Sequence, residues 1–293
     1  MTSETCILRI RKLTFFAESR FQSSFQYSTN PITIVSDLTN QSETVYRDLE
    51  PQWSVPKRKR RRHLLLRLLS WVVKLVIVAI VLSFLLVLPF RWIAPPTSSF
   101  MLQSYFFSEQ GFGYPYAYNW TSYRDISPYM GLAAIAAEDQ RFPDHHGFDF
   151  EELEQAIEDY QQGEELRGAS TISQQVAKNL YLWSGRNPLR KALEAWFTVL
   201  IEALWSKQRI LEIYLNIAQF SDHGFGVEVA SQQFFDRSAS QLTLEESALL
   251  AAVLPAPEIY RIDQPSADVL QRQDWILQQM DQLGGLDYLK KIE

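Results

Sequence analysis

Gly-Ala-Ser-Thr-Ile-Ser-Gln-Gln-Val-Ala-Lys-Asn, residues 168–179, is a polar stretch between segments that have the pattern of apolar helices. Ser170 and Thr171 are residue types that cap the start of a helix. In such a helix Gln174 and Lys178 share one face, because they are four residues apart. Amide donors beside a cation suit an anionic, hydroxyl-rich ligand. On this stretch alone, a solvated surface helix rich in amides is an equal alternative.

The segments on either side predict an all-α domain. Ser127 and Pro128 form a helix start, and the nearly all-apolar helix that follows ends at Glu138. Thr243 and Glu246 form a capping box for a later helix. Further helices are expected at residues 150–161, 170–183, 188–204, 207–217, 227–235, 244–253 and 266–283. After residue 125 no segment alternates convincingly between apolar and polar residues, so no strand is predicted there.

The composition excludes several classes of function. A formal net charge of -6 and a pI of about 5.4 argue against nucleic acid as a partner. Cys6 is the only cysteine, which excludes an intramolecular disulfide and a cysteine-based zinc site. Residues 1–91 carry 14 Lys and Arg against 6 Asp and Glu, whereas residues 92–293 carry 14 against 28. This asymmetry predicts two parts of the chain in different surroundings.

A membrane anchor is predicted near the N-terminus. Six basic residues at 57–62 precede an apolar run at 64–90. Its uncharged part, residues 75–90, reaches about 23 residues when residues 68–74 are included, which is enough to cross a bilayer. Basic residues beside a span favour the cytoplasmic side, so residues 1–56 are expected to be a disordered cytoplasmic tail. A nucleic-acid patch and a buried core helix are the disfavoured alternatives. Residues 91–125 are rich in aromatic side chains, which fits either the membrane interface or ordinary packing.

Two carboxylates are candidate acid–base groups. Glu138 ends an apolar helix, so burial is expected to raise its pKa and make it a usable base. Glu194 lies one turn beyond Arg190 and Lys191, whose charges should keep it ionised. For either carboxylate alone, a structural ion pair is an equal alternative.

Basic residues cluster in the otherwise acidic second part of the chain. Of its 14 Lys and Arg residues, six lie between Lys178 and Arg209. Arg and Lys side chains are the usual partners of phosphate oxygens. The alternative is pairing on helix surfaces, such as Lys207 with Glu212. With the membrane anchor and the buried carboxylate, the cluster suggests sugar transfer from a lipid-linked diphosphate.

Five ordered motifs lie between Glu138 and Phe235. They are Glu138-Asp139-x-x-Phe142-x-x-His145-x-Gly147-x-Asp149, residues 168–175 with Lys178-Asn179, Arg190-Lys191 with Glu194, residues 207–216, and residues 224–235. Together they resemble the motifs of glycosyltransferase family 51, the peptidoglycan transglycosylases, in their monofunctional biosynthetic branch. Ala169 departs from the pattern, since many members have glycine there. The transpeptidase domain that bifunctional relatives carry is not expected.

The resemblance implies a lysozyme-like domain of two helical lobes at residues 126–285, followed by a C-terminal tail at 286–293. It implies transfer of a growing glycan from undecaprenyl diphosphate to the GlcNAc 4-hydroxyl of lipid II, with inversion and without transpeptidation. It further implies a single-pass protein of the bacterial inner membrane with a periplasmic catalytic domain. Other cell-wall synthesis and division proteins are possible partners, and no tightly bound cofactor is expected.

Residue roles follow from the same resemblance. Glu138 would be the general base, and Glu194 would assist the leaving group directly or through a divalent cation such as Mg or Mn. The substrate-binding residues would be Ser170, Gln174, Gln175, Lys178, Asn179, Arg186, Arg190 and Lys191. Structural support would come from Asp139, Phe142 and His145.

Two alternative functions stay open. A lysozyme-like lytic enzyme also uses carboxylates on glycans, but it needs no diphosphate site, so the basic cluster argues against it. A non-catalytic scaffold for wall assembly predicts that Glu138 is dispensable.

Overall fold

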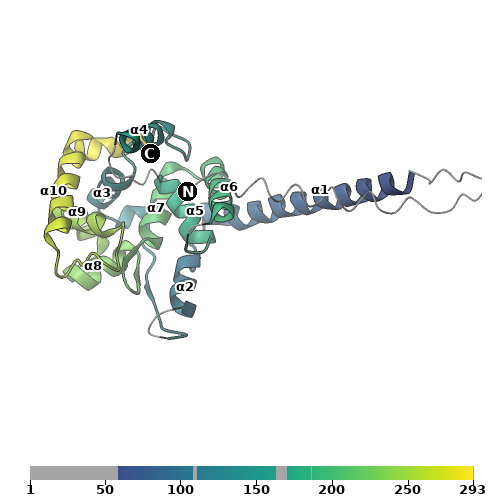
Figure 1. Cartoon of the computed structure of the whole chain (residues 1–293). Helices are drawn as coiled ribbons and strands as arrows, with labels where there is room; N and C mark the ends of the chain where they lie inside the picture. The colour runs from purple at the N-terminus through teal and green to yellow at the C-terminus, as the bar shows by residue number, and fades with distance from the viewer. Residues whose placement is uncertain (1–58, 108–110, 163–169, 186, 293) are drawn as a thin grey trace, which may run out of the picture. The chain divides into compact units, whose positions relative to one another are not determined.

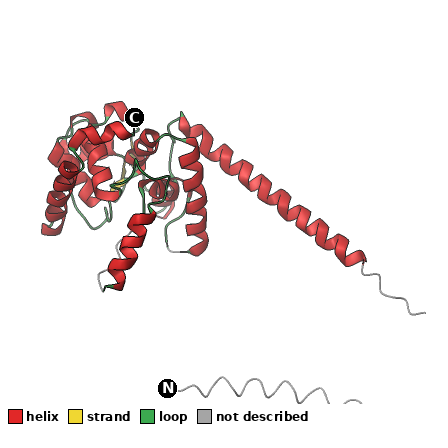
Figure 2. Ribbon diagram, turned by 90° about the horizontal axis from the view of Figure 1, so that it is seen from above, coloured by secondary structure: helices red, strands yellow, loops and turns green. Residues whose placement is uncertain are grey.

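The computed structural model describes residues 59–107, 111–162, 170–185 and 187–292. The predicted tail at 1–56, the first two residues of the basic run and Arg186 therefore lie outside the described residues. Within the described part, the chain is mainly helical (Figure 2), which confirms the predicted fold class.

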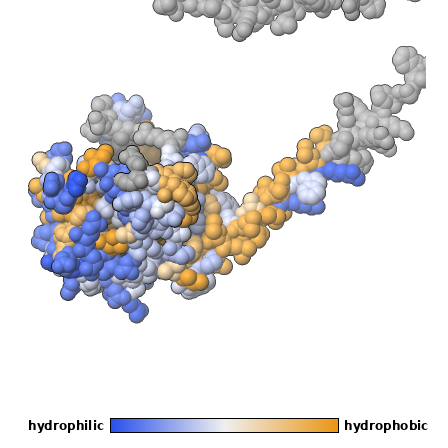
Figure 3. Space-filling model, turned by 90° about the horizontal axis from the view of Figure 1, so that it is seen from below, coloured by the Kyte–Doolittle hydropathy of each residue, from blue (hydrophilic) through white to orange (hydrophobic). Residues whose placement is uncertain are grey.

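The first helix, α1 (Lys59–Val87), continues into a short 3₁₀ helix, η1 (Leu88–Arg91). Among the described residues, one helix is long and apolar enough to cross a membrane, at Leu65–Arg91. Its leucine, valine and isoleucine side chains are largely exposed, and Figure 3 shows the hydrophobic surface that they form along α1. A helix that exposes apolar side chains on all sides is typical of a membrane span.

Several of the remaining helices have starts that short polar side chains cap. Thr171 caps α5 and Thr243 caps α9, each in a capping box, and Ser206 caps α7. The helices are α2 (Ser99–Phe107), α3 (Pro128–Glu138), α4 (Phe150–Gln161), α5 (Ile172–Tyr181), α6 (Pro188–Leu204), α7 (Lys207–Ile217), α8 (Val227–Phe235), α9 (Leu244–Val253) and α10 (Ala267–Gln282). Short 3₁₀ helices are η2 (Tyr123–Asp125), η3 (Ala239–Gln241) and η4 (Gly285–Lys291).

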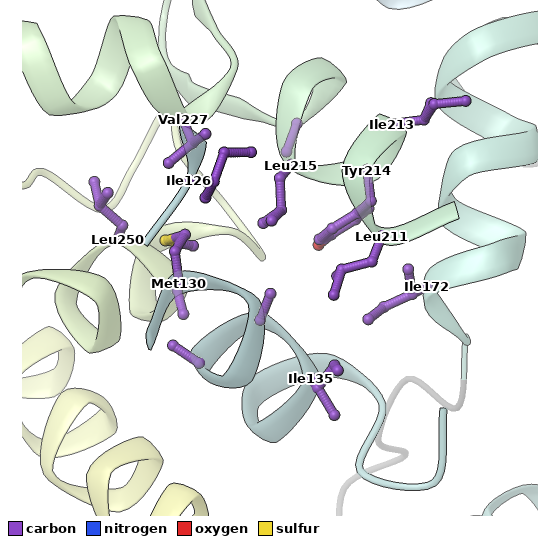
Figure 4. Close-up of a cluster of buried hydrophobic side chains, with 14 of the residues drawn as sticks. Ile126, Met130, Ile135, Ile172, Leu211, Ile213, Tyr214, Leu215, Val227 and Leu250 are labelled. Atoms are coloured by element: carbon purple, nitrogen blue, oxygen red, sulfur yellow. The ribbon is translucent and has the colours of Figure 1, made fainter. Parts of the chain in front are cut away.

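The helices form two groups that share a core (Figure 1). In one group α3 packs against α9 and α10, and in the other α5 packs against α6 and α7. The α7 helix also contacts α3, so it joins the two groups. Figure 4 shows the shared core, where Met130 and Ile135 of α3 lie near Leu211 and Leu215 of α7. Burial of these side chains holds the end of α3 against α5 and α7.

Two sequence predictions are wrong in detail. The chain contains a small sheet of β1 (Ala117–Tyr118), β2 (Gln219–Ser221) and β3 (Gly224–Phe225), in the order β1-β3-β2. The β1–β3 pairing is parallel and β2–β3 is antiparallel. Strands of two or three residues are too short to show alternation, so the sequence gives no signal for them.

The predicted C-terminal tail at 286–293 is also wrong over its described part. The η4 helix packs against α3, and Tyr288, Leu289 and Ile292 are buried. The Tyr288 hydroxyl donates to the Gln140 carbonyl oxygen at 2.5 Å, directly after the end of α3. The C-terminal residues thus belong to the core that holds α3.

The junction between α1 and the helical domain centres on Arg209. Its guanidinium donates to the carbonyl oxygens of Phe90 at 2.8 Å and Ile93 at 2.7 Å, and to the Glu212 carboxylate at 2.6 Å. It also lies 5.0 Å from the centre of the Trp120 ring. Glu212 is therefore the partner of Arg209 and not of Lys207, whose ammonium donates to Glu202 at 2.8 Å.

We expect Arg209→Ala to lower the free energy of unfolding by about 2–4 kcal/mol, because Glu212 loses its cation and two carbonyl oxygens lose a charged donor. Arg261→Ala is the matched control, since the Arg261 side chain is 67% exposed in its pair with Asp263. Thermal unfolding in detergent, followed by circular dichroism, should show a lower transition temperature for Arg209→Ala alone. Equal transition temperatures for the two variants would contradict the assigned role of Arg209.

Candidate active site

Glu138 is the last residue of α3, and the seven residues Met130 to Ala136 before it are all buried. Its carboxylate is 13% exposed and accepts a hydrogen bond from the Gln175 amide at 2.7 Å. Its other oxygen lies 3.4 Å from the guanidinium of Arg272. Burial raises the pKa of Glu138, while the Gln175 hydrogen bond and the charges of Arg272 and Lys178 act in the opposite direction. A buried carboxylate with a raised pKa can act as a general base.

The Gln175 amide is oriented by Tyr214 of α7. The Tyr214 hydroxyl donates to the Gln175 side-chain oxygen at 3.3 Å, which leaves the Gln175 amide nitrogen to face Glu138. Tyr214 is fully buried, and burial raises its pKa well above the usual value, so the phenol stays protonated as a donor. Three helices, α3, α5 and α7, thereby fix one oxygen of the carboxylate.

The loop after Glu138 is held by Asp139 and His145. Asp139 accepts from His145 Nε2 at 2.9 Å and from the backbone N–H of Ile172, at the start of α5, at 2.9 Å. His145 Nδ1 accepts the Gly147 N–H at 3.1 Å, so Nε2 carries the proton. The Thr171 hydroxyl donates to the Gly147 carbonyl oxygen at 2.7 Å. These contacts tie the loop to α5.

Gly147 and Phe142 complete the packing of this loop. Gly147 has a φ of +90°, and a Cβ there would lie 2.7 Å from the Thr198 methyl group. Phe142 is fully buried, and the Lys207 ammonium lies 4.5 Å from its ring centre. The geometry fits the structural support expected of Asp139, Phe142 and His145.

Asp139, His145 and Asp149 bring ligand atoms within 4.8 Å of one another, as a metal site requires. Each of these residues already has hydrogen-bond partners. Asp149 accepts from the N–H groups of Glu151 and Glu152 at the start of α4, and the other two residues bind each other and α5. We therefore interpret the group as structural.

The second carboxylate, Glu194, lies among cations on α6. Its two oxygens pair with Arg190, at 2.6 Å, and with Lys191, and its side chain is 3% exposed. Lys178 of α5 is largely buried, and burial lowers its pKa. The charges of Glu194 and Glu138 both oppose that shift, so Lys178 lies in the electric field of both carboxylates. Three cations around one carboxylate leave an excess of positive charge, which suits a phosphate-type anion.

The structure differs from expectation at Gln174. Its side-chain oxygen accepts the Thr171 N–H at 3.0 Å in the capping box of α5, and the residue is buried. The Gln174 side-chain oxygen therefore supports the helix start, and binding of substrate by this residue stays a prediction. Ser170 is exposed just before α5. Asn179 follows Lys178, and its side-chain oxygen is buried with no hydrogen-bond partner among the described residues.

Arg272 and Tyr214 are the site residues that sequence reasoning missed. Tyr214 lies inside the fourth motif, residues 207–216, but no role was assigned to it there. Arg272 lies on α10, outside all five motifs, and its contact with Glu138 joins residues 134 positions apart. No local pattern in the sequence indicates that contact.

The chain is similar to known proteins over most of its length. The family model described as Transglycosylase matches residues 109–281. The chain is 45% identical over 244 residues to a biosynthetic peptidoglycan transglycosylase of Xanthomonas campestris pv. campestris, covering 83% of this chain and 97% of the relative. It is 50% identical over 205 residues to the protein of the same name from Mannheimia succiniciproducens, covering 69% and 84%. For that of Salmonella newport the identity is 55% over 181 residues, covering 61% and 75%.

We expect Asp139→Ala to loosen the start of α5, because the buried His145 and Ile172 donors lose their acceptor. Each unsatisfied donor costs about 1–3 kcal/mol, so backbone hydrogen exchange in the first turn of α5 should accelerate by about tenfold or more. Asp144→Ala is the control on the same loop, since that side chain is 49% exposed. Unchanged exchange in Asp139→Ala, measured by mass spectrometry, would argue against the loop-to-helix tie.

Proposed function

This chain belongs to the transglycosylase family, and from that membership we propose that it polymerises peptidoglycan glycan strands from lipid II. The observation that carries the proposal is the pair of carboxylate environments: Glu138 is a buried base held by Gln175 and Arg272, and Glu194 lies in a cation-rich group on α6. Such an arrangement suits a reaction in which a hydroxyl loses a proton while a diphosphate departs.

In the proposed reaction Glu138 removes the proton from the GlcNAc 4-hydroxyl of lipid II. The resulting oxygen attacks the anomeric carbon at the carrier end of the growing glycan and forms the new glycosidic bond. The bond between that carbon and the phosphate oxygen breaks, and the electron pair leaves with undecaprenyl diphosphate. Attack opposite the leaving group inverts the anomeric configuration. The burial of Glu138 and its two donors, Gln175 and Arg272, support its role as the base.

The cations are proposed to bind the diphosphate. Lys178, Arg190 and Lys191 stabilise the negative charge that develops on the leaving group, and Arg186 is proposed to join them. Glu194 holds Arg190 and Lys191 in place through its two oxygens. The cations around Glu194 do not fit a divalent metal held by the protein, so the proposal includes no step through one. Gln175, Ser170 and Asn179 are proposed to lie on the donor side.

The position of α1 supports action at a membrane, where the lipid-linked substrates are found. The basic residues before the apolar span favour a cytoplasmic N-terminus, so the proposal places the catalytic domain on the outer, periplasmic side. Other wall-synthesis and division proteins are proposed as partners of this domain. The proposed activity is glycan polymerisation without peptide cross-linking.

We expect Glu138→Gln to lower polymerisation of labelled lipid II by about 10²- to 10⁴-fold, the usual contribution of a general base. Glutamine keeps the shape of the side chain but cannot accept the proton. The assay uses the full chain in detergent, with Glu154→Gln, an exposed change on α4, as the matched control.

Normal polymerisation by Glu138→Gln, with intact folding by circular dichroism, would overturn the assignment of the base. A separate incubation with uncrosslinked glycan tests the lytic alternative. Cleavage of that glycan in the absence of lipid II would reject the polymerase proposal.

We expect a bell-shaped dependence of the polymerisation rate on pH. Burial raises the pKa of Glu138 above its usual 4.5, so the ionised base is lost as the pH falls through the raised value. Burial lowers the pKa of Lys178 below its usual 10.5, so its cation is lost as the pH rises through the lowered value. Lys178→Arg should extend the alkaline side of the profile, because arginine stays charged.

Lys178→Ala should lower the rate by roughly 10²-fold or more at pH values where Lys178 is charged, as expected for loss of one preorganised charge, and by less on the alkaline side, where the unaltered chain has lost that charge too. An alkaline limb that stays in place in Lys178→Arg would assign that limb to another group.

A further inference from the structure

We propose that Arg272 of α10 is a positioning residue for the base: its guanidinium lies beside the Glu138 carboxylate and keeps it ionised. This inference rests on the proposed function, because it assigns to that reaction a residue outside the five motifs. It concerns an element, α10, to which the sequence analysis gave no role in the chemistry.

The geometry of the contact supports an electrostatic role. The Arg272 Nη2 atom lies 3.4 Å from Glu138 Oε1 and 3.4 Å from the Ala137 carbonyl oxygen, so it covers the C-terminal end of α3. The other Glu138 oxygen is bound by Gln175. The two oxygens are therefore held from two directions, by an amide on α5 and by a cation on α10. Because 3.4 Å is long for a hydrogen bond, charge accounts for more of the Arg272 contact than directional bonding does.

The position of Arg272 is set by the packing of α10 along the end of α3. Two turns further along α10, the Gln279 side-chain oxygen accepts from the Gln140 amide at 3.1 Å. Tyr288 binds the Gln140 carbonyl oxygen from η4. The Arg272 guanidinium also lies 6.0 Å from the Trp275 ring centre. These contacts place the guanidinium beside Glu138 without a competing carboxylate partner among the described residues.

The charges around Glu138 come from several elements. Lys178 of α5 and Arg272 of α10 are cations, Asp139 is the adjacent carboxylate, and Tyr214 of α7 is a protonated phenol. In the proposed reaction the Lys178 ammonium pairs with the diphosphate of the donor. Once the donor is bound, Arg272 is therefore the cation near Glu138, among the described residues, that can still stabilise the ionised base.

This role has a consequence that a purely structural role lacks. Removal of the Arg272 charge raises the pKa of Glu138, so the acid limb of the rate profile moves toward higher pH. Above that limb the rate is kept or increased, because a base with a higher pKa accepts a proton more readily. A structural defect instead lowers the rate at every pH and leaves the limb in place.

The experiment measures lipid II polymerisation from acid to alkaline pH by the full chain, Arg272→Gln and Arg272→Lys. We expect the acid limb of Arg272→Gln to move to higher pH by about 1 unit. This shift is at the lower end of the range for removal of one nearby cation, because the Arg272 side chain is 33% exposed and water screens its charge. Arg272→Lys should restore most of the original position. Arg261→Gln, an exposed cation just before α10, is the matched control. An acid limb that does not move in Arg272→Gln overturns the inference.

A second measurement keeps the inference separate from the proposed function. Carbon-13 NMR of glutamate-labelled protein follows the Glu138 carboxyl during titration, with Glu138→Gln identifying its signal. We expect Glu138 to titrate about 1 pH unit higher in Arg272→Gln than in the unaltered chain. An unchanged titration overturns the role of Arg272. If the unaltered chain makes no polymer, the proposed function fails while this titration still decides the inference. Arg272→Met replaces Arg272→Gln if the glutamine variant does not fold.

Discussion

The burial of one carboxylate, Glu138, is the constraint on which the surrounding structure depends. An ionised group at the end of an apolar helix is costly unless charges and hydrogen bonds compensate for the lost water. Here the compensation comes from α5 through Gln175, from α7 through Tyr214, and from α10 through Arg272. The two groups of helices are thus joined by polar contacts as well as by the hydrophobic core. The same burial that makes the site costly also makes the carboxylate a stronger base than one in water.

Contacts that do not involve Glu138 itself also support this carboxylate, because they fix the start of α5. Asp139 and His145 bind the loop after α3 to the start of α5, and the capping box of Thr171 and Gln174 defines where α5 begins. A shift of that start by one residue would rotate Gln175 and Lys178 by about 100° around the helix axis. The loop after α3 and the cap of α5 therefore determine which α5 side chains face Glu138.

Local features of the sequence predicted much of this structure. Caps such as Thr171 and Thr243 identify helix starts because they act on N–H groups two or three residues away. The capping role of Gln174 was not predicted, since an amide in a capping box and an amide that faces a ligand look alike in sequence. Arg272 could not be predicted, because its partner lies 134 residues away. The buried η4 segment was mistaken for a tail because seven residues are too few to show a period.

The hydrogen bonds of Arg209 give the junction at the end of α1 a further significance. With α1 in a bilayer, a domain joined by such contacts samples few orientations, unlike one on a flexible linker. The domain then loses its orientational freedom relative to the membrane once, when the chain folds. It does not lose that freedom again each time it meets a substrate, which is itself confined to the membrane plane. The search between enzyme and substrate becomes two-dimensional, and each collision presents the same face of the domain.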